Sequence, residues 1–350
     1  MSPMAINQGE HEVRKLQSTG GSTFTVSLPR PWVIKYNLQA RDSIRIDWRP
    51  SGALRLTPFE KLKERKHSVH FSTSKLPENG LHDHLMGAYI SGVDTIKVSF
   101  KKDEKKKVSM QVRRFLRSTR GFEIYEETDT TIELMCLMNA GDMPLHASLN
   151  RMYLQVTSLI RDIVSVIEGE DQEYISDCEE RENEVDALLY LIERQVRVLL
   201  ESHSVASGLN LSRTQALEYA NLARSLERMM DHAYSLATII QANPKVTSNM
   251  ISNEPFESLL IWQESLKELM INIRTRDSFR IEEARTNLKE VQRLLIIHEE
   301  DLLSNHLKNK WTALDFTISE SVRRLCAYAR DFGEILLNMK IYSELIQSKY

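Results

Sequence analysis

The chain is poor in cysteine, glycine and proline. Its 350 residues contain three cysteines, twelve glycines and nine prolines. Cys136, Cys178 and Cys326 are far apart and lack metal-ligand spacing, so neither disulfides nor a structural zinc site are expected. Cys178 and Cys326 fall within helical patterns, where small buried residues are common. This cysteine usage fits a reducing, cytoplasmic location.

Long apolar segments are also absent. No run of roughly 18 uncharged apolar residues occurs, and residues 1–11 are polar, with no apolar signal core. We therefore expect a disordered segment at 1–11 and no membrane insertion. The net charge of −3, with 27% charged residues, excludes a uniformly basic nucleic-acid coat.

Catalytic signatures are missing as well. The sequence has no phosphate-binding glycine loop, no dinucleotide fingerprint and no nucleophile constellation. Carboxylate-bridged metal enzymes use Glu-x-x-His from two helices, and none of the expected helices contains that motif. We therefore expect no enzymatic activity, and a metal enzyme is only a remote alternative.

Glycine and proline concentrate in the N-terminal third, where short strands are expected. Residues 22–28 and 43–49 alternate apolar and polar side chains as half-buried strands do, and 53–57 follow a Pro-Ser-Gly turn. Pro31 is well placed to begin a short helix through Trp32–Tyr36. Fewer than fifty residues in this pattern bury too little apolar surface to be stable alone. Dimerisation is therefore expected.

The segments E-V-R-K-L, G-G-S-T-F-T-V-S-L-P, W-V-I-K-Y-N-L and R-D-S-I-R-I lie in order within residues 12–58. In this order they resemble the AbrB/SpoVT family of swapped-hairpin domains. The resemblance implies a small β barrel formed by interleaved hairpins of two chains, with DNA bound to one basic face.

Four basic residues are the candidate DNA contacts under this resemblance: Arg14, Lys15, Arg30 and Lys35. Arg14 and Lys15 match the family's basic pair on the first strand. The basic pair that many members carry on the short helix is replaced by Val33–Ile34. The alternative interpretation is that these charges are solvated residues on a module that only dimerises.

Residues 60–66 form a charged connector, and residues 67–138 then alternate strand and helix signals. Their order, β-α-β-α-β-β, predicts a small α+β layer. Its helices are expected at 81–90 and 105–120, and a short T-D-T turn separates the last two strands. The sequence gives no function for this segment.

From residue 143 to the end, the apolar spacing is helical throughout. Helices are expected at 145–169, 172–202, 212–243, 254–276, 279–307 and 311–347. Three helices, a polar linker with Pro244 and three more helices of similar length indicate an internal duplication. The expected fold is therefore mainly α, with one three-helix bundle at 143–243 and a second at 254–350.

Aligning the two halves supports the duplication. The apolar residues of the first half fall on apolar residues of the second, in the pairs Leu226 with Val322, Met229 with Leu325, Ala233 with Ala329 and Leu236 with Phe332. The acidic residues do not repeat, because Glu227 falls on Arg323 and Asp231 on Ala327.

Two pairs of acidic residues are spaced four apart on neighbouring helices: Glu182 with Asp186, and Glu227 with Asp231. Side chains four apart share a helix face, and antiparallel packing of the two helices brings all four carboxylates together. Oxygen-only ligands suit Mg²⁺, Mn²⁺ or Fe better than structural zinc. The alternative is an ordinary solvated face, with Arg224 and Arg228 neutralising the acids.

The segment 224–233 reads R-x-L-E-R-x-x-D-H-A, within tandem three-helix bundles that carry E/D-x-x-x-D pairs. In this respect the chain resembles the PhoU family of phosphate-uptake regulators, in what looks like an archaeal arrangement. The resemblance implies metal ligation by Glu182, Asp186, Glu227 and Asp231. It also implies a phosphate-transport or signalling protein as partner.

Three functional hypotheses follow. The leading one is a phosphate-responsive, DNA-binding regulator whose bundle binds metal and senses phosphate status or docks a partner. The second is a protein-interaction adaptor of a phosphate transporter that does not bind DNA. The third, a carboxylate-bridged metal enzyme, has the least support.

Overall fold

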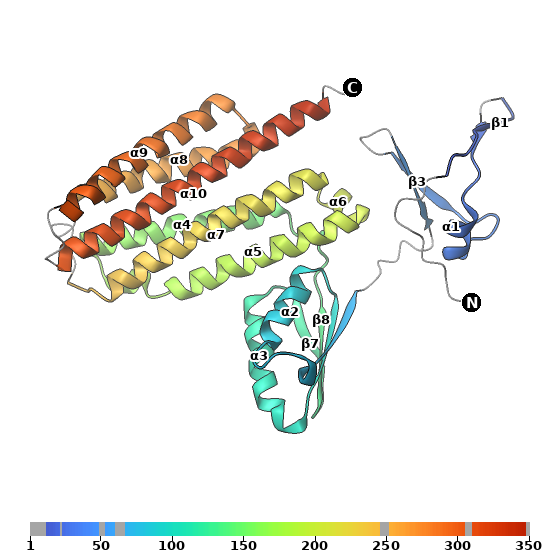
Figure 1. Cartoon of the computed structure of the whole chain (residues 1–350), viewed down its shortest axis with the longest axis horizontal. Coiled ribbons are helices and arrows are strands. Elements are labelled where there is room, and N and C mark those ends of the chain that lie inside the picture. The colour runs from blue at the N-terminus through green and yellow to red at the C-terminus, as the bar shows by residue number, and fades with distance from the viewer. Residues whose placement is uncertain are drawn as a thin grey trace. The chain divides into compact units, whose positions relative to one another are not determined.

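The computed structural model describes residues 12–21, 23–48, 53–59, 67–245, 252–304 and 310–347 (Figure 1). It divides the chain into two compact units, residues 1–66 and residues 67–350. The segments expected to be disordered (1–11) and to form a charged connector (60–66) lie outside the described residues. Within the described ranges, no helix is long and apolar enough to cross a membrane.

The N-terminal unit consists of two hairpins and one short helix. Strands β1 (Gln17–Thr19) and β2 (Thr23–Thr25) pair antiparallel, as do β3 (Ile44–Trp48) and β4 (Leu54–Pro58). The short helix α1 (Arg30–Lys35) has proline in its first turn, as predicted from Pro31.

Two expectations for this unit need correction. The strand expected at 22–28 is confined to Thr23–Thr25. The described strands form two separate two-stranded sheets, and the barrel expected from two interleaved chains stays a prediction. Arg14 and Lys15 precede β1 and do not lie on it. A two-stranded ribbon is only marginally stable without further strands or a packed face. The short strands therefore agree with a unit that lacks a partner surface in the single chain.

The α+β segment, residues 67–138, has the predicted element order. It runs through β5 (Ser68–Ser72), α2 (Leu81–Ile90), β6 (Thr95–Ser99), α3 (Lys105–Ser118), β7 (Phe122–Glu127) and β8 (Thr131–Cys136). The sheet order is β5-β6-β8-β7, with β5 parallel to β6 and the other pairs antiparallel. Tyr89, Phe115 and Phe122 form an edge-to-face aromatic cluster in its core.

The remaining chain is helical. Its elements are α4 (Leu145–Glu168), α5 (Cys178–Glu201), α6 (His203–Gly208), α7 (Arg213–Gln241), α8 (Asn253–Thr275), α9 (Ser278–Ser304) and α10 (Lys310–Gln347). All six long helices that the periodicity predicts are present.

The start of α5 and the short helix α6 differ from the prediction. The helix expected at 172–202 begins at Cys178, because a separate 3-10 turn occupies residues 172–175. Asp171 stabilises that turn by accepting from the Glu173 backbone N–H at 2.9 Å. Sequence periodicity alone does not separate a 3-10 turn from the helix that follows it.

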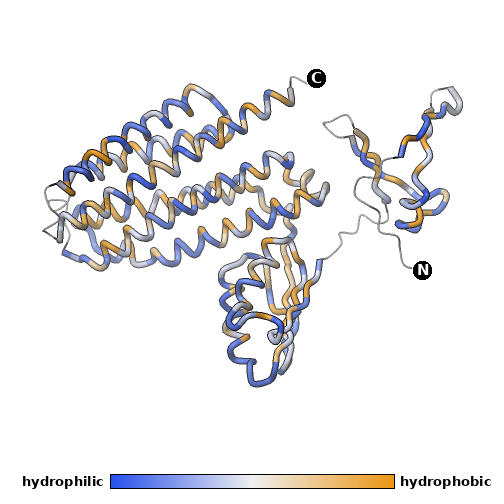
Figure 2. The backbone as a smooth tube through the Cα atoms, in the orientation of Figure 1, coloured by the Kyte–Doolittle hydropathy of each residue, from blue (hydrophilic) through white to orange (hydrophobic). Residues whose placement is uncertain are grey.

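Helices α4, α5 and α7 pack together, as do α8, α9 and α10, and α7 packs directly against α10. One continuous apolar core runs through all six helices, and Figure 2 shows apolar residues recurring along these helices between polar ones. The aligned apolar residues of the two halves are at most 2% exposed: Leu226, Met229, Ala233, Leu236, Val322, Leu325, Ala329 and Phe332. The repeated stripe is therefore part of this common core.

Candidate functional site

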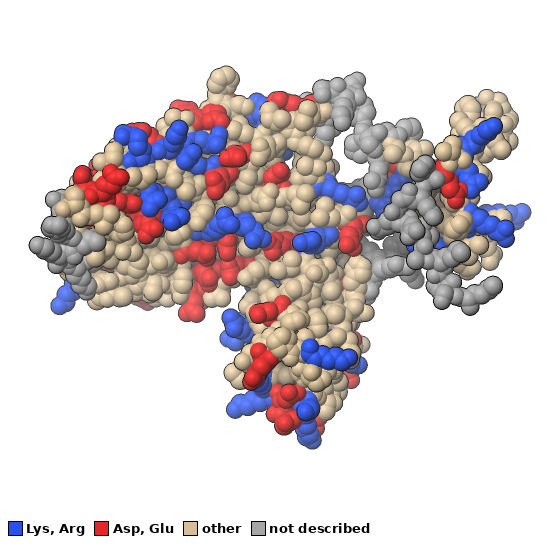
Figure 3. All heavy atoms as spheres, viewed as in Figure 1, with Lys and Arg blue, Asp and Glu red and all other residues tan. Residues whose placement is uncertain are grey.

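Glu182 and Asp186 on α5 come close to Glu227 and Asp231 on α7, as the spacing predicts. We call these four residues the acidic cluster. Glu182, Asp186 and Glu227 are half-buried, and Asp231 is exposed. Figure 3 shows acidic side chains gathered along α5, next to basic side chains along α7.

The four carboxylates interact electrostatically. Burial, followed by the nearby Asp186 and Asp231, raises the pKa of Glu182 to about 7. Burial, followed by Asp231 and Asp186, raises the pKa of Glu227 to about 7. Burial also raises the pKa of Asp186 and of Asp231. Like charges held together in a partly desolvated place disfavour the ionised form of each group.

The two arginines expected to neutralise the cluster have other partners. Arg224 forms an ion pair with Glu193. The guanidinium of Arg228 lies over the ring of Tyr328, 5.6 Å from its centre. Both arginines still lower the pKa of Glu227, but less than burial and the neighbouring acids raise it. The cluster therefore carries a charge that its cationic neighbours only partly offset.

A bound cation would offset that charge. The donor chemistry fits a hard cation, because all four ligands are carboxylate oxygens. As the side chains are placed, however, no three His, Cys, Asp or Glu residues among the described ones are close enough to hold one ion. Binding would therefore require rotation of the half-buried side chains toward each other.

Other acidic residues, on α5 and at its N-cap, either form ion pairs or are exposed to solvent. Glu184 pairs with Arg151 at 2.7 Å, and Asp177 pairs with Arg181 at 2.9 Å. Glu179 and Glu180 are exposed. Glu184 and Asp177 are therefore neutralised by arginines, and Glu179 and Glu180 lie in solvent.

His232 is half-buried and stacks on the Tyr328 ring, with 5.7 Å between ring centroids. Burial, followed by the charge of Arg324, lowers the pKa of His232. The stacking on Tyr328 favours a structural role for His232 over a role as a ligand.

The second half of the bundle has an ion pair where the first half has acids. Arg323, the counterpart of Glu227, donates from Nε to the two carboxylate oxygens of Glu299 on α9, at 2.9 and 3.0 Å. Glu299 is 7% exposed and also accepts from the Ser319 hydroxyl at 3.2 Å. The equivalent region of the second half is therefore internally neutralised, as the lost acids suggest.

The candidate DNA contacts Arg14, Lys15, Arg30 and Lys35 are all exposed in the N-terminal unit. Arg14 forms an ion pair with Glu12, and the Lys35 ammonium lies 6.0 Å from the centre of the Tyr36 ring. They are available to a ligand, but the single chain does not show them forming one surface.

Sequence reasoning missed two residues of α5 next to the cluster, Tyr190 and Arg194. Burial, followed by Asp186 and Glu227, raises the pKa of Tyr190 to about 12, so its hydroxyl lies close to the acids. Arg194 is 4% exposed and binds the α+β segment. Tyr190 and Arg194 follow Asp186 by four and eight residues, which places them on the same helix face as Asp186. This spacing could have identified both residues from the sequence.

Residues 149–240 match the family model of the PhoU domain. This part of the chain is similar to the PhoU domain. The match covers about a quarter of the sequence, from α4 through α7, and includes all four residues of the acidic cluster. It supports membership of the PhoU family and points to a role in regulating phosphate homeostasis. No curated protein matches the chain.

Proposed function

We propose that the protein regulates phosphate homeostasis by binding DNA through its N-terminal unit and metal ions through the acidic cluster. The observation that carries this proposal is the acidic cluster itself. It lies inside the matched PhoU domain and holds four coupled carboxylates without an ion-pair partner among the described residues. Metal occupancy, phosphate status or a docked phosphate-transport or signalling protein would then change the state of the bundle.

Glu182, Asp186, Glu227 and Asp231 would hold the cation, with Fe, Mn or Mg as the expected metals. When bound, the cation supplies positive charge and open coordination positions for an anion such as phosphate. The protein's own contribution is to hold four carboxylates on two packed helices, three of them half-buried.

Exposed apolar side chains in the N-terminal unit support a homodimer. Phe24 is 64% exposed, Ile34 66% and Ile46 56%. Among the described side chains of residues 12–59, only Pro58 is buried. A unit without a core of its own gains stability by burying this surface against a second copy. A dimer also places two sets of basic residues on one DNA duplex.

The DNA-binding part is tested by gel shift with the protein's own upstream DNA. Wild type should bind at low salt and lose affinity as salt rises, because phosphate contacts release counterions. Arg14→Ala/Lys15→Ala should weaken binding by about tenfold or more and reduce the salt dependence. Lys245→Ala, a basic residue outside the N-terminal unit, is the matched control.

Absence of binding by wild type at low salt would remove the DNA-binding part and leave the adaptor. One feature favours that second function: Val33–Ile34 stands where the resemblance places a basic pair, and Ile34 is largely exposed. An apolar exposed residue there suits a protein contact better than a phosphate contact.

A further inference from the structure

Helix α5 carries four polar side chains spaced one turn apart: Glu182, Asp186, Tyr190 and Arg194. Side chains four residues apart lie next to each other on one helix face. The first two belong to the acidic cluster, and the last two contact the α+β segment. One face of α5 therefore connects the cluster to a segment that the proposed function leaves without a role.

Arg194 holds the α+β segment on α5. Its guanidinium donates to the backbone oxygens of Tyr89 and Val93, both at 2.8 Å, and to Asp94 Oδ1 at 3.2 Å. It also lies 5.2 Å from the centre of the Tyr89 ring and 5.4 Å from that of Phe122. These contacts satisfy a buried cation and fix the C-terminal end of α2 on α5.

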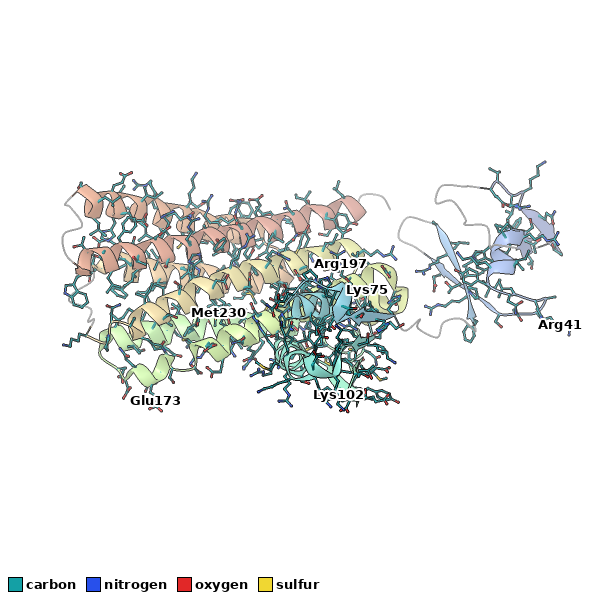
Figure 4. The ribbon with its side chains drawn as sticks, turned by 60° about the horizontal axis from the view of Figure 1, so that its bottom comes forward. Arg41, Lys75, Lys102, Glu173, Arg197 and Met230 are labelled. Carbon is teal, nitrogen blue, oxygen red and sulfur yellow. The ribbon has the colours of Figure 1, made fainter. Side chains whose placement is uncertain are left out.

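The turn after α2 lies in direct contact with α5. Gly92 has a φ of +85°, and a Cβ atom at this position would come within 2.8 Å of Val198 Cγ2. Both the backbone conformation and the available space therefore require glycine. Figure 4 shows Arg197 of α5 beside the α+β segment, and Met230, between Glu227 and Asp231 in the sequence, outside the area it covers.

Tyr190 contacts both regions. Its ring packs against the core of the α+β segment. Its hydroxyl lies close to the Asp186 carboxylate, one helical turn away on the same face of α5. Burial raises the pKa of Asp186, and the Tyr190 hydroxyl partly offsets that rise. Movement of Asp186 therefore acts on a ring that is part of the α+β packing, one turn away from Arg194.

We propose that Tyr190 is a positioning residue that couples the acidic cluster to the α+β segment. The Tyr190–Asp186 contact helps to hold the α2–β6 turn on α5, and a cation bound at the cluster strengthens that hold. The cation half of this inference rests on the proposed function. The contact itself does not. Linkage requires the reverse effect too, so that loosening the docked segment weakens cation binding.

Hydrogen exchange followed by mass spectrometry on the full chain tests the contact without metal. Tyr190→Phe keeps the ring and removes the hydroxyl, and Asp186→Asn removes the charged partner. Both should speed exchange of the amides in residues 89–98 by about tenfold, because each variant removes the polar contact that helps to position the Tyr190 ring. Tyr153→Phe, a half-buried tyrosine of α4, should leave these amides unchanged.

A second arm adds Mn²⁺ and measures its binding by calorimetry in the same samples. In wild type, Mn²⁺ should slow exchange of residues 89–98, whereas Tyr190→Phe should bind Mn²⁺ without that slowing. Equal exchange in wild type and Tyr190→Phe without metal overturns the coupling. If wild type binds no Mn²⁺, the proposed cation binding fails, and the metal-free comparison still decides the coupling.

Discussion

Arg323→Ala should destabilise the protein by about 3 kcal/mol, near the lower end for breaking a buried ion pair. The reason is the position of Glu299, which is 7% exposed and has Arg323 as its charged partner. Without the guanidinium, the Glu299 carboxylate stays in a place where water does not solvate it well. Urea unfolding of purified protein, followed by circular dichroism, measures the loss.

The adjacent Arg324 is the matched control. Its side chain is 49% exposed and pairs with Glu320 at 3.6 Å on the surface. Arg324→Ala should therefore change the free energy of unfolding by less than about 0.5 kcal/mol. The double variant Arg323→Leu/Glu299→Leu should regain most of the stability, because well-packed apolar residues replace a buried pair at little cost. Equal losses for Arg323→Ala and Arg324→Ala would show that the buried pair is unimportant.

Phe24→Asp should weaken the homodimer by a factor of about 10² to 10⁴. Burial of one phenylalanine side chain contributes about 1.5–3 kcal/mol, and a symmetric dimer contains the substitution twice. Phe24 is 64% exposed in the single chain, so its burial must come from the partner. Sedimentation velocity across a range of protein concentrations measures the change.

Tyr125→Asp tests whether any exposed aromatic residue has this effect. Tyr125 lies on β7 of the α+β segment and is 66% exposed, which matches Phe24 closely. It should leave the dimer unchanged. A monomeric wild type at micromolar concentration, or a dimer that tolerates Phe24→Asp, would contradict the assignment of the N-terminal unit as the dimer contact.

The sequence predicts those parts of the fold that depend on local spacing. Helical periodicity locates all six long helices, and the alternation in residues 67–138 gives the order of its strands and helices. The acidic cluster is found for the same reason, since spacing of four places each pair on one face. Antiparallel packing of α5 and α7 then brings the two pairs together.

Features that depend on contacts between distant residues are not predicted. Arg194 binds backbone oxygens about a hundred positions earlier in the chain, and no periodicity reports such a contact. The ion pair of Arg323 with Glu299 is likewise visible only once α9 lies against α10. The strand expected at 22–28 is shorter in the single chain because pairing partners, and not spacing alone, decide strand length.

We expect the acidic cluster to be an electrostatically coupled site in which a bound cation relieves the repulsion between carboxylates. The measurement is the free energy of unfolding at pH 5 and pH 8, with and without Mn²⁺. In the folded protein the pKa of Glu182 and of Glu227 is raised to about 7, from an ordinary pKa of 4.5. Between these values the folded state binds more protons, so metal-free stability should fall as the pH rises.

Relative to Glu182→Gln/Glu227→Gln, wild type should lose roughly 1–2 kcal/mol over this pH range, after allowance for solvent screening. Mn²⁺ at about 100 times its dissociation constant should add about 2.7 kcal/mol to wild type at pH 8 and much less to the variant. Glu180→Gln, an exposed acid on the same helix, should behave as wild type. The same pH dependence in wild type and the double variant, with no stabilisation by Mn²⁺, would contradict the claim.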